Sequence, residues 1–276
     1  MAVSGGADSL ALMALAVQAL GPASVRALHV DHGLRPESSV EAELVAGYAD
    51  SLSIACSSVR VQVDVGPNLE ARARTARYAV LPADVCTGHT LDDLAETVLL
   101  NVVRGAGLDG LAALARSRPG GPRRPILGLR RRQTVELCAR LGWDPVQDAM
   151  NADPRFRRVR VRGEVLPLLS SVAERDVAAV LARQAYLAAD EADLLDRLAA
   201  ALDASDAVAL RRAPVALARR SMRRWLVESG VGDGHPLDAA CVERALRVAA
   251  GHDVACDLNG GWRLVRTAQR LRVMRP

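Results

Sequence analysis

The order of apolar and polar positions divides the chain into two parts of different character. In the first part, short apolar runs alternate with longer segments in which apolar residues recur at helical spacing. Strands are predicted at 25–30, 58–63, 84–87 and 124–127. Helices are predicted directly after residue 9 and at 36–52, 68–81, 91–104 and 133–141. This alternation predicts an α/β fold with a doubly wound parallel sheet, in which ligands bind at the carboxyl ends of the strands.

From about Val165 onward the pattern becomes helical. Alanine- and leucine-rich segments predict helices at 172–202, 214–228 and 237–249. Residues 254–274 alternate like strands around Asn259-Gly260-Gly261, which is a hairpin signal. We therefore expect an α/β domain at 1–164 and a smaller helical domain with a short C-terminal β hairpin at 165–276.

A glycine-rich loop, Ser4-Gly5-Gly6-Ala7-Asp8-Ser9, joins the apolar residues Ala2-Val3 to the first helical run. Its glycines allow a sharp turn, and backbone amides at a helix N-terminus favour phosphate. The string matches the pyrophosphate loop of the N-type ATP pyrophosphatases and lacks the lysine of a Walker loop. A plain strand-turn-helix connection is the alternative. Strands usually have about five or six residues, so we expect the first strand to be unusually short.

The arginine and cysteine contents of the chain indicate the kind of partner and the cellular environment that suit it. The chain has 36 basic residues, and all of them are arginine because lysine is absent. Five arginines lie within residues 155–162, a density that fits contact with a phosphate backbone. Genomic base composition would explain the missing lysine but not this clustering. The five cysteines form no Cys-x-x-Cys pair, which favours a reducing cytoplasm, and no apolar run is long enough to span a bilayer.

Candidate nucleotide and metal ligands follow the predicted strands. Asp31 and His32 directly follow the second strand, and His89 follows the fourth. Asp93 and Glu96 are four and seven residues beyond His89, so the three share one helix face. Two carboxylates beside a triphosphate suit Mg²⁺ or the ammonium group of an amine substrate. The alternatives are a solvated helix face and a structural histidine, while a histidine metal site lacks the usual ligand spacing.

Together these segments resemble the tRNA(Ile)-lysidine synthetase family, a branch of the PP-loop superfamily of N-type ATP pyrophosphatases. The matching blocks lie at 4–9, 29–35, 68–78, 88–97, 124–127 and 148–169. The resemblance covers about residues 1–170 and implies an adenine nucleotide α-hydrolase-like fold. It also implies that residues 1–164 form a PP-loop ATP-binding catalytic domain and that residues 165–276 contact tRNA.

The resemblance implies an ATP-dependent C–N ligase. Such enzymes adenylate the 2-oxo group of the wobble cytidine in an isoleucine tRNA with a CAU anticodon. Free L-lysine then replaces AMP to give lysidine, which changes codon reading from AUG to AUA. The implied cofactors are ATP and Mg²⁺, the implied location is the cytoplasm, and a homodimer is compatible with the resemblance.

The resemblance also assigns roles to individual residues. The nucleotide-binding set comprises Ser4, Gly5, Gly6, Ala7, Asp8, Ser9, His29, Asp31 and His89. The catalytic set comprises Asp8, Asp93, Glu96 and Arg74, with Asp8 and Asp93 as metal ligands. The substrate-binding set comprises Arg104, Arg158 and Arg162, and Val159 departs from the asparagine common in the family.

Two other functions are compatible with parts of the sequence. A tRNA sulfur transferase would use the same loop but would need reactive, usually paired cysteines. A non-catalytic RNA-binding module would keep the arginines and would have no need of Asp8, Asp93 and Glu96.

Overall fold

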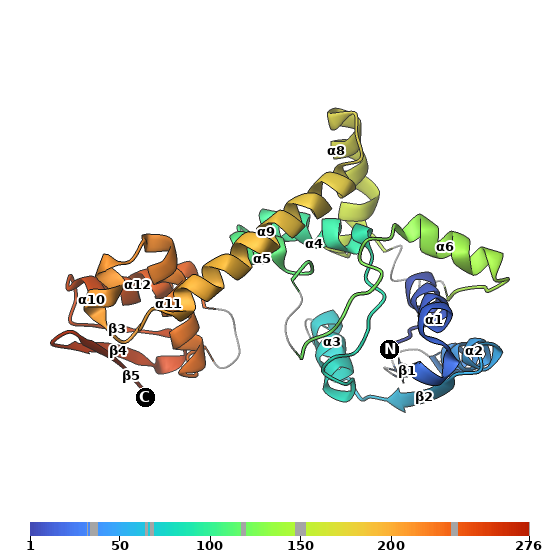
Figure 1. Ribbon diagram of the computed structural model, residues 1–276, viewed down its shortest axis with the longest axis horizontal. Coiled ribbons are helices and arrows are strands. Elements are labelled where there is room, and N and C mark those ends of the chain that lie inside the picture. Colours follow the sequence, from blue (N-terminus) through green and yellow to red (C-terminus); the bar gives the residue numbers. More distant parts are fainter. Residues whose placement is uncertain are drawn as a thin grey trace. The chain divides into compact units, whose positions relative to one another are not determined.

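The computed structural model describes residues 1–31, 33, 38–63, 66, 69–116, 120–146, 153–232 and 237–275 (Figure 1). The chain forms two compact units, Met1–Ala189 and Asp190–Pro276. Their boundary falls within helix α9 (Val177–Ala200), C-terminal to the boundary predicted after residue 164. The catalytic and tRNA-contacting roles of the two parts stay predictions.

A parallel sheet forms the centre of the first unit. Strand β1 (Arg26–Asp31) pairs in parallel with β2 (Ala55–Arg60). On the opposite edge of β1, Ala2 pairs in parallel with Leu28, so the short segment before the glycine-rich loop takes the place of a central strand. The strand predicted at 25–30 is confirmed, and the one predicted at 58–63 begins earlier, at Ala55.

The strand predicted at 84–87 is reduced to single pairings, and no strand forms at 124–127. The Ala2 amide donates to the Cys86 carbonyl at 2.9 Å, and Cys86 pairs in parallel with Arg123. The prediction of a strand at 124–127 is wrong, since residues 125–128 form a turn and Pro125 has no amide to donate to a ladder. The segments therefore lie in the order β2, β1, 1–3, 85–87 and 123. Residues 1–3 and 85–87 are neighbours in the sheet, and the strand order reverses between them. The loops that follow these two segments therefore lie at the place where doubly wound sheets bind ligands.

Helices pack around this sheet in two groups. The helices of the first unit are α1 (Ala7–Leu20), α2 (Ser38–Ser51), α3 (Leu69–Val80), α4 (Leu91–Val103), α5 (Leu108–Ala112), α6 (Arg131–Arg140), α7 (Arg157–Arg160) and α8 (Leu166–Ala173), with a 3₁₀ turn at Pro22–Ser24 and a π-helix at Val161–Val165. Helices α1, α2 and α6 share a core in which Leu10 and Val45 are fully buried. A second core joins α4 to the start of α9 through Leu94 and Ala185. His32, Asn68 and residues 148–151 of the predicted motifs lie outside the described residues.

The long helix predicted at 172–202 is broken in the structure. Helix α8 ends at Ala173, and Glu174 follows with a positive φ of 50°. The Asp176 carboxylate then accepts a hydrogen bond from the Ala178 amide at 3.1 Å and caps the start of α9. The periodic apolar pattern continues across this break, which is why it predicted a single helix.

The second unit is helical with a small antiparallel sheet. It contains the end of α9, α10 (Ala207–Arg212), α11 (Val215–Glu228), α12 (Ala239–Ala250), β3 (Ala255–Asp257), a 3₁₀ turn at Asn259–Gly261, β4 (Arg263–Thr267) and β5 (Arg270–Met274). The helices predicted at 214–228 and 237–249 are confirmed. Asn259–Gly261 joins β3 to β4 as the hairpin signal predicted, and a further turn pairs β4 with β5. One core, which includes Met222, Leu226 and Leu264, holds these helices against the sheet.

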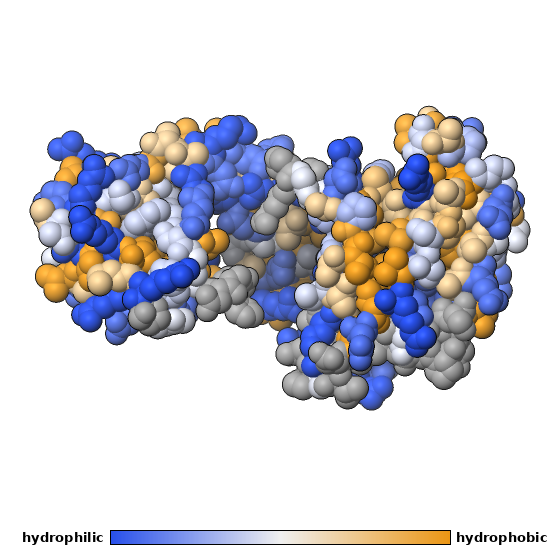
Figure 2. All heavy atoms as spheres, turned by 90° about the horizontal axis from the view of Figure 1, so that it is seen from below, coloured by the Kyte–Doolittle hydropathy of each residue, from blue (hydrophilic) through white to orange (hydrophobic). Residues whose placement is uncertain are grey.

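In the described part of the chain, no helix is long and apolar enough to cross a bilayer. Apolar side chains do reach the surface of the first unit, such as Val80 and Val135. Figure 2 shows apolar side chains lying among charged ones on this unit.

Candidate active site

The glycine-rich loop leaves backbone donors at the start of α1. Gly5 has a positive φ of 84°, which a side chain would strain, and turns the chain from the sheet toward the helix. The Ser4 amide donates to Ser9 Oγ at 3.1 Å, and the Ser9 hydroxyl donates to the Gly6 carbonyl at 2.9 Å. No side chain caps α1, so its first amides point toward any ligand placed there. Because the helix dipole adds positive charge at this end, the loop suits a phosphate group.

A cavity of about 500 Å³ opens between this loop and the loop that follows residues 85–87. Its volume lies in the range of small-molecule and cofactor sites. Gly88 marks the closest approach of the two loops, because a Cβ atom there would lie 2.8 Å from the Asp8 carbonyl oxygen. Only glycine lets the two loops meet at this distance.

Two carboxylates in this cavity face one guanidinium group. Asp8 lies in the first turn of α1, Asp93 in the first turn of α4, and Arg131 begins α6. Arg131 Nη2 lies 3.3 Å from Asp8 Oδ2 and 3.0 Å from Asp93 Oδ1. The Thr134 hydroxyl donates to Asp8 Oδ1 at 2.5 Å, and the Thr90 amide donates to Asp93 Oδ2 at 2.8 Å. The two carboxylates thus flank a single cation position, and oxygen ligands of this kind suit Mg²⁺.

The two carboxylates differ in their electrostatic environments. Burial raises the pKa of Asp8 more than Arg131 and Thr134 lower it. Burial also acts to raise the pKa of Asp93, but Arg131 and the Thr90 amide outweigh it, and the pKa falls below its usual value. Asp93 is therefore the more firmly fixed negative charge of the pair.

His29 has an unpaired acceptor in the cavity lining. Its side chain is buried, and Nδ1 lies 2.9 Å from the Val3 carbonyl, to which only an N–H can donate. In the neutral ring Nε2 is then an acceptor, and among the described residues it has no hydrogen-bond partner. Since buried polar atoms are normally paired, Nε2 fits a donor group of a bound nucleotide.

His89 lies in the loop directly before the N-cap Thr90 of α4, so the prediction that it shares a helix face with Asp93 and Glu96 is wrong. Its Nδ1 is 2.8 Å from the Thr87 hydroxyl oxygen. Burial is the largest cause that lowers the pKa of His89 to about 4. His89 is therefore uncharged at neutral pH and adds no positive charge to the cavity.

Replacement of His89 with glutamine is expected to flatten the acid side of the stability profile. The folded pKa of about 4 lies below the usual 6.5, so the unfolded chain takes up the proton first. The stability that the neutral ring contributes is full above pH 6.5 and falls by up to about 3 kcal/mol toward pH 4. Thermal unfolding between pH 7.5 and 4.5 measures this, with His252→Gln as the control. If the unfolding temperatures of the parent and His89→Gln fall in parallel as the pH is lowered, the pKa of His89 is not lowered in the folded protein.

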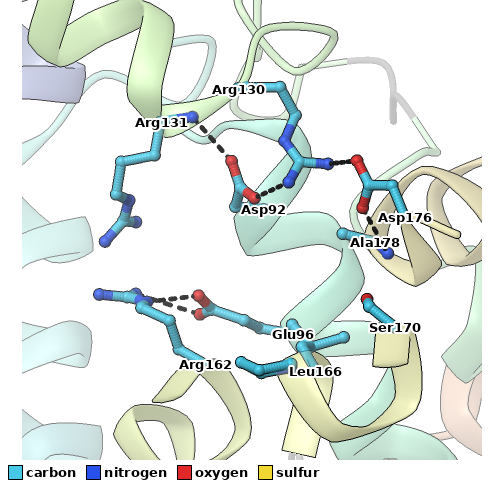
Figure 3. A pocket seen from close by; sticks show the side chains of 10 residues that line it. Asp92, Glu96, Arg130, Arg131, Arg162, Leu166, Ser170, Asp176 and Ala178 are labelled. Carbon is cyan, nitrogen blue, oxygen red and sulfur yellow. Dashed lines mark hydrogen bonds and ion pairs between the residues drawn. The ribbon is translucent and has the colours of Figure 1, made fainter. Parts of the chain in front are cut away.

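A second cavity of about 260 Å³ shares Arg131 and Arg162 with the first cavity. Figure 3 shows the side chains that line it. Its lining comprises Asp92, Glu96, Arg130, Arg131, Arg162, Leu166, Pro167, Ser170, Asp176 and Ala178. Arg130 pairs with Asp92 at 3.0 Å and with Asp176 at 2.6 Å, and so ties the start of α9 to α4. Figure 3 shows the Arg162 side chain directed at Glu96, with Arg131 lying across from it.

Glu96 is a fully buried carboxylate that holds two arginines. Arg158 Nε donates to Oε2 at 2.9 Å, and Arg162 Nε donates to Oε1 at 2.6 Å. Arg158 also donates to the Thr97 hydroxyl at 2.8 Å. Both arginines come from the α7 and π-helix segment, so Glu96 fixes this segment against α4.

The arginine cluster at 155–162 is therefore divided between two environments. Arg158 and Arg162 turn inward to Glu96 and line the first cavity. Arg155 pairs with Asp153 at 2.6 Å, and Arg160 pairs with Glu164 at 3.2 Å, both at exposed positions. The inward pair lines the cavity, whereas Arg155 and Arg160 pair with acidic residues at the surface.

Known proteins resemble the chain in both sequence and fold. A family model for the PP-loop domain matches residues 1–169. The chain is 48% identical to the tRNA(Ile)-lysidine synthase of Nocardia farcinica (strain IFM 10152), over 83% of this chain and 76% of that protein. It is 44% identical to that of Mycolicibacterium paratuberculosis (strain ATCC BAA-968 / K-10), over 83% and 74%. The chain belongs to the tRNA(Ile)-lysidine synthase family.

A solved structure supports the fold of this family member. The U34-tRNA thiolase NcsA from Methanococcus maripaludis with its [4Fe-4S] cluster superposes with a TM-score of 0.56. The match covers 68% of this chain and 70% of that one at 17% sequence identity. At this identity the likeness concerns the fold alone, and it agrees with the predicted α/β architecture.

The structure gathers most residues that the family resemblance singled out. Those that line the first cavity are Ser4, Gly6, Ala7, Asp8, Ser9, His29, Arg74, His89, Asp93, Arg158 and Arg162. Glu96 lines the second cavity, and Gly5 shapes the turn. Arg104, the exposed C-cap of α4, lines neither cavity. Asp31 accepts a hydrogen bond from the Gly33 amide at 2.7 Å and also stands outside both linings. The roles of all these residues stay predictions.

Sequence reasoning missed the contribution of α6. Arg131 and Thr134 contact Asp8, whereas the apolar pattern predicted only a helix at 133–141. The signal was available, because α6 follows the last segment of the sheet and ligand-binding residues gather at that edge. The pairing of Arg130 with Asp176 joins residues 46 apart in the chain, and no local pattern predicts it.

Proposed function

We propose that this chain converts the wobble cytidine of an isoleucine tRNA with a CAU anticodon into lysidine, with ATP and free L-lysine as co-substrates. The change switches codon reading from AUG to AUA. Membership of the family supports this function. The observation that carries it is the placement of Asp8 and Asp93 opposite each other beside a phosphate-binding loop, in a cavity of nucleotide size.

In the proposed first step, the cytidine 2-oxo oxygen attacks the α-phosphorus of ATP, and pyrophosphate leaves. Mg²⁺ supplies charge neutralisation on the phosphates, and Asp8 and Asp93 would hold it. The amides at the start of α1 bind phosphate oxygens, while His29 Nε2 accepts a hydrogen bond from the nucleotide. Arg74 extends from α3 into the same cavity and stabilises the charge that develops on the phosphate.

In the proposed second step, the amine of lysine attacks C2 of the cytidine, AMP leaves, and the amine releases a proton. The second cavity offers a route to this point, since it lies beside Glu96 and Arg162. Glu96 would orient the lysine ammonium once Arg158 or Arg162, which now hold its two oxygens, turns from it to bind the lysine carboxylate. Holding the amine next to the activated carbon supplies the orientation that such a displacement requires.

The wider assignments belong to the same proposal. The second unit and the exposed Arg104 contact the tRNA, and the enzyme works in the cytoplasm. The homodimer stays a prediction.

The pKa values and positions of the cysteine thiols argue against the alternative function of sulfur transfer. A reactive cysteine needs a lowered pKa. Burial instead raises the pKa of the Cys56, Cys138 and Cys256 thiols. Among the described residues, the linings of both cavities contain no cysteine.

The decisive experiment is transfer of labelled lysine to tRNA. The protein is incubated with ATP, Mg²⁺, labelled lysine and an isoleucine tRNA with a CAU anticodon. We expect label in the tRNA that requires ATP and is absent from a control tRNA in which the wobble cytidine is replaced by uridine. AMP formation with no lysine in the tRNA would overturn the choice of amine, and absence of both products would overturn the proposal.

A further inference from the structure

Arg131 lies between the two carboxylates that would hold a divalent cation. Its Nη2 lies within 3.3 Å of Asp8 and within 3.0 Å of Asp93. Mg²⁺ binds oxygen ligands at about 2.0–2.1 Å, so an ion that contacts both carboxylates would sit in the gap that this nitrogen fills. Two cations in one gap would repel each other, and only one of them can bind there at a time.

The surroundings of Arg131 offer its side chain a second place. The guanidinium lies at the junction of the two cavities and contributes to the lining of both. Its Nε is buried and has no hydrogen-bond partner among the described residues. A buried donor without a partner is unfavourable, and a phosphate oxygen in the first cavity would satisfy it.

The backbone of Arg131 is held independently of its side chain. The Arg131 amide donates to Asp92 Oδ2 at 2.7 Å, which fixes the start of α6 against α4. The Thr134 hydroxyl oxygen lies 2.7 Å from the Arg131 carbonyl oxygen, but its hydrogen is donated to Asp8, so the amide contact is what holds the backbone. The side chain can therefore change partners while the helix start keeps its place.

We propose that Arg131 is a built-in counterion that competes with Mg²⁺ for Asp8 and Asp93 and turns to the nucleotide phosphates when the metal binds. The residue neutralises the charge of the two carboxylates before metal and nucleotide bind. It then supplies a positive charge to the phosphates, so one side chain serves both stages. The inference rests on the proposed nucleotide site but not on the tRNA or lysine chemistry.

The test measures two binding equilibria in Arg131→Gln, neither of which needs tRNA or lysine. Titration calorimetry gives the affinity for Mg²⁺ alone, and a fluorescent ATP analogue in EDTA gives the affinity for nucleotide without metal. We expect Mg²⁺ to bind on the order of tenfold more tightly, because its competitor is gone. Nucleotide without metal should bind on the order of tenfold more weakly, because Asp8 and Asp93 then repel it. A merely structural defect would weaken both equilibria.

Arg132→Gln is the matched control, since it removes the same charge from an exposed neighbour in the same helical turn. Equal effects in the two variants, or unchanged Mg²⁺ affinity in Arg131→Gln, would overturn the inference. Should Arg131→Gln fail to fold, a crystal structure of the parent with Mg²⁺ and a non-hydrolysable ATP analogue decides. Arg131 still bridging Asp8 and Asp93 there would overturn the proposal. Failure of lysine transfer would leave these outcomes unaffected, so the two proposals can fail separately.

Discussion

Replacement of Asp8 with asparagine is expected to abolish AMP formation while leaving thermal unfolding nearly unchanged. The substitution removes the charge that would bind Mg²⁺ beside the phosphate loop. Loss of one preorganised electrostatic contact in an active site typically slows the reaction by about a hundredfold to a thousandfold. The fold should tolerate the change, because asparagine keeps an acceptor for the Thr134 hydroxyl and burial already disfavours the charged form of Asp8.

The measurement is AMP released in the presence of tRNA, lysine, ATP and Mg²⁺, together with a thermal unfolding curve. Asp50→Asn is the control, since it removes one negative charge from an exposed position on α2. Normal AMP release from Asp8→Asn would remove Asp8 from the metal site. A large fall in unfolding temperature would instead show that the carboxylate is structural.

The elements that could be predicted from sequence are those whose apolar period is long and uninterrupted. Helices α4, α11 and α12 and strand β1 are of this kind. Where a predicted element is wrong, the cause is a single residue that does not change the spacing of apolar positions. Pro125 stops a strand from forming at 124–127, and Glu174 adopts a left-handed conformation that breaks a continuous helical pattern. The short aspartate-capped helix α10, which follows Asp206, was also missed, because six residues carry too little periodicity.

Several candidate site residues were predictable from their position near the end of a strand. Asp8, His29, His89 and Asp93 lie at such positions and line the first cavity, whereas Asp31 at the end of β1 does not. Partners contributed by other elements were not predictable. Glu96 meets Arg158 and Arg162 across separations of 62 and 66 residues, and no local pattern predicts that both arginines pair with this carboxylate. Local spacing indicates which residues can do chemistry, whereas tertiary pairing decides which of them meet.

Replacement of Glu96 with glutamine is expected to separate the two half-reactions. Adenylated tRNA should still form, because Asp8, Asp93 and the phosphate loop are unchanged. Lysine should be needed at far higher concentration, since loss of a charged contact costs about 2 to 4 kcal/mol, or roughly a thirtyfold to thousandfold change. The protein should also lose stability, because the amide –NH₂ of glutamine would face an arginine that now hydrogen-bonds to a carboxylate oxygen. The measurement is the adenylated tRNA trapped without lysine, followed by a lysine titration.

Glu96→Asp distinguishes charge from packing. Aspartate keeps the negative charge but shortens the side chain, so it weakens the contacts with Arg158 and Arg162, as glutamine does. If the charge orients lysine, Glu96→Asp should need much less lysine than Glu96→Gln although both unfold at lower temperature than the parent. Equal lysine requirements in the two variants would make Glu96 a residue that only positions its arginines. Absence of the adenylated intermediate in Glu96→Gln would instead place Glu96 in the first half-reaction, through the arginines that line the nucleotide cavity.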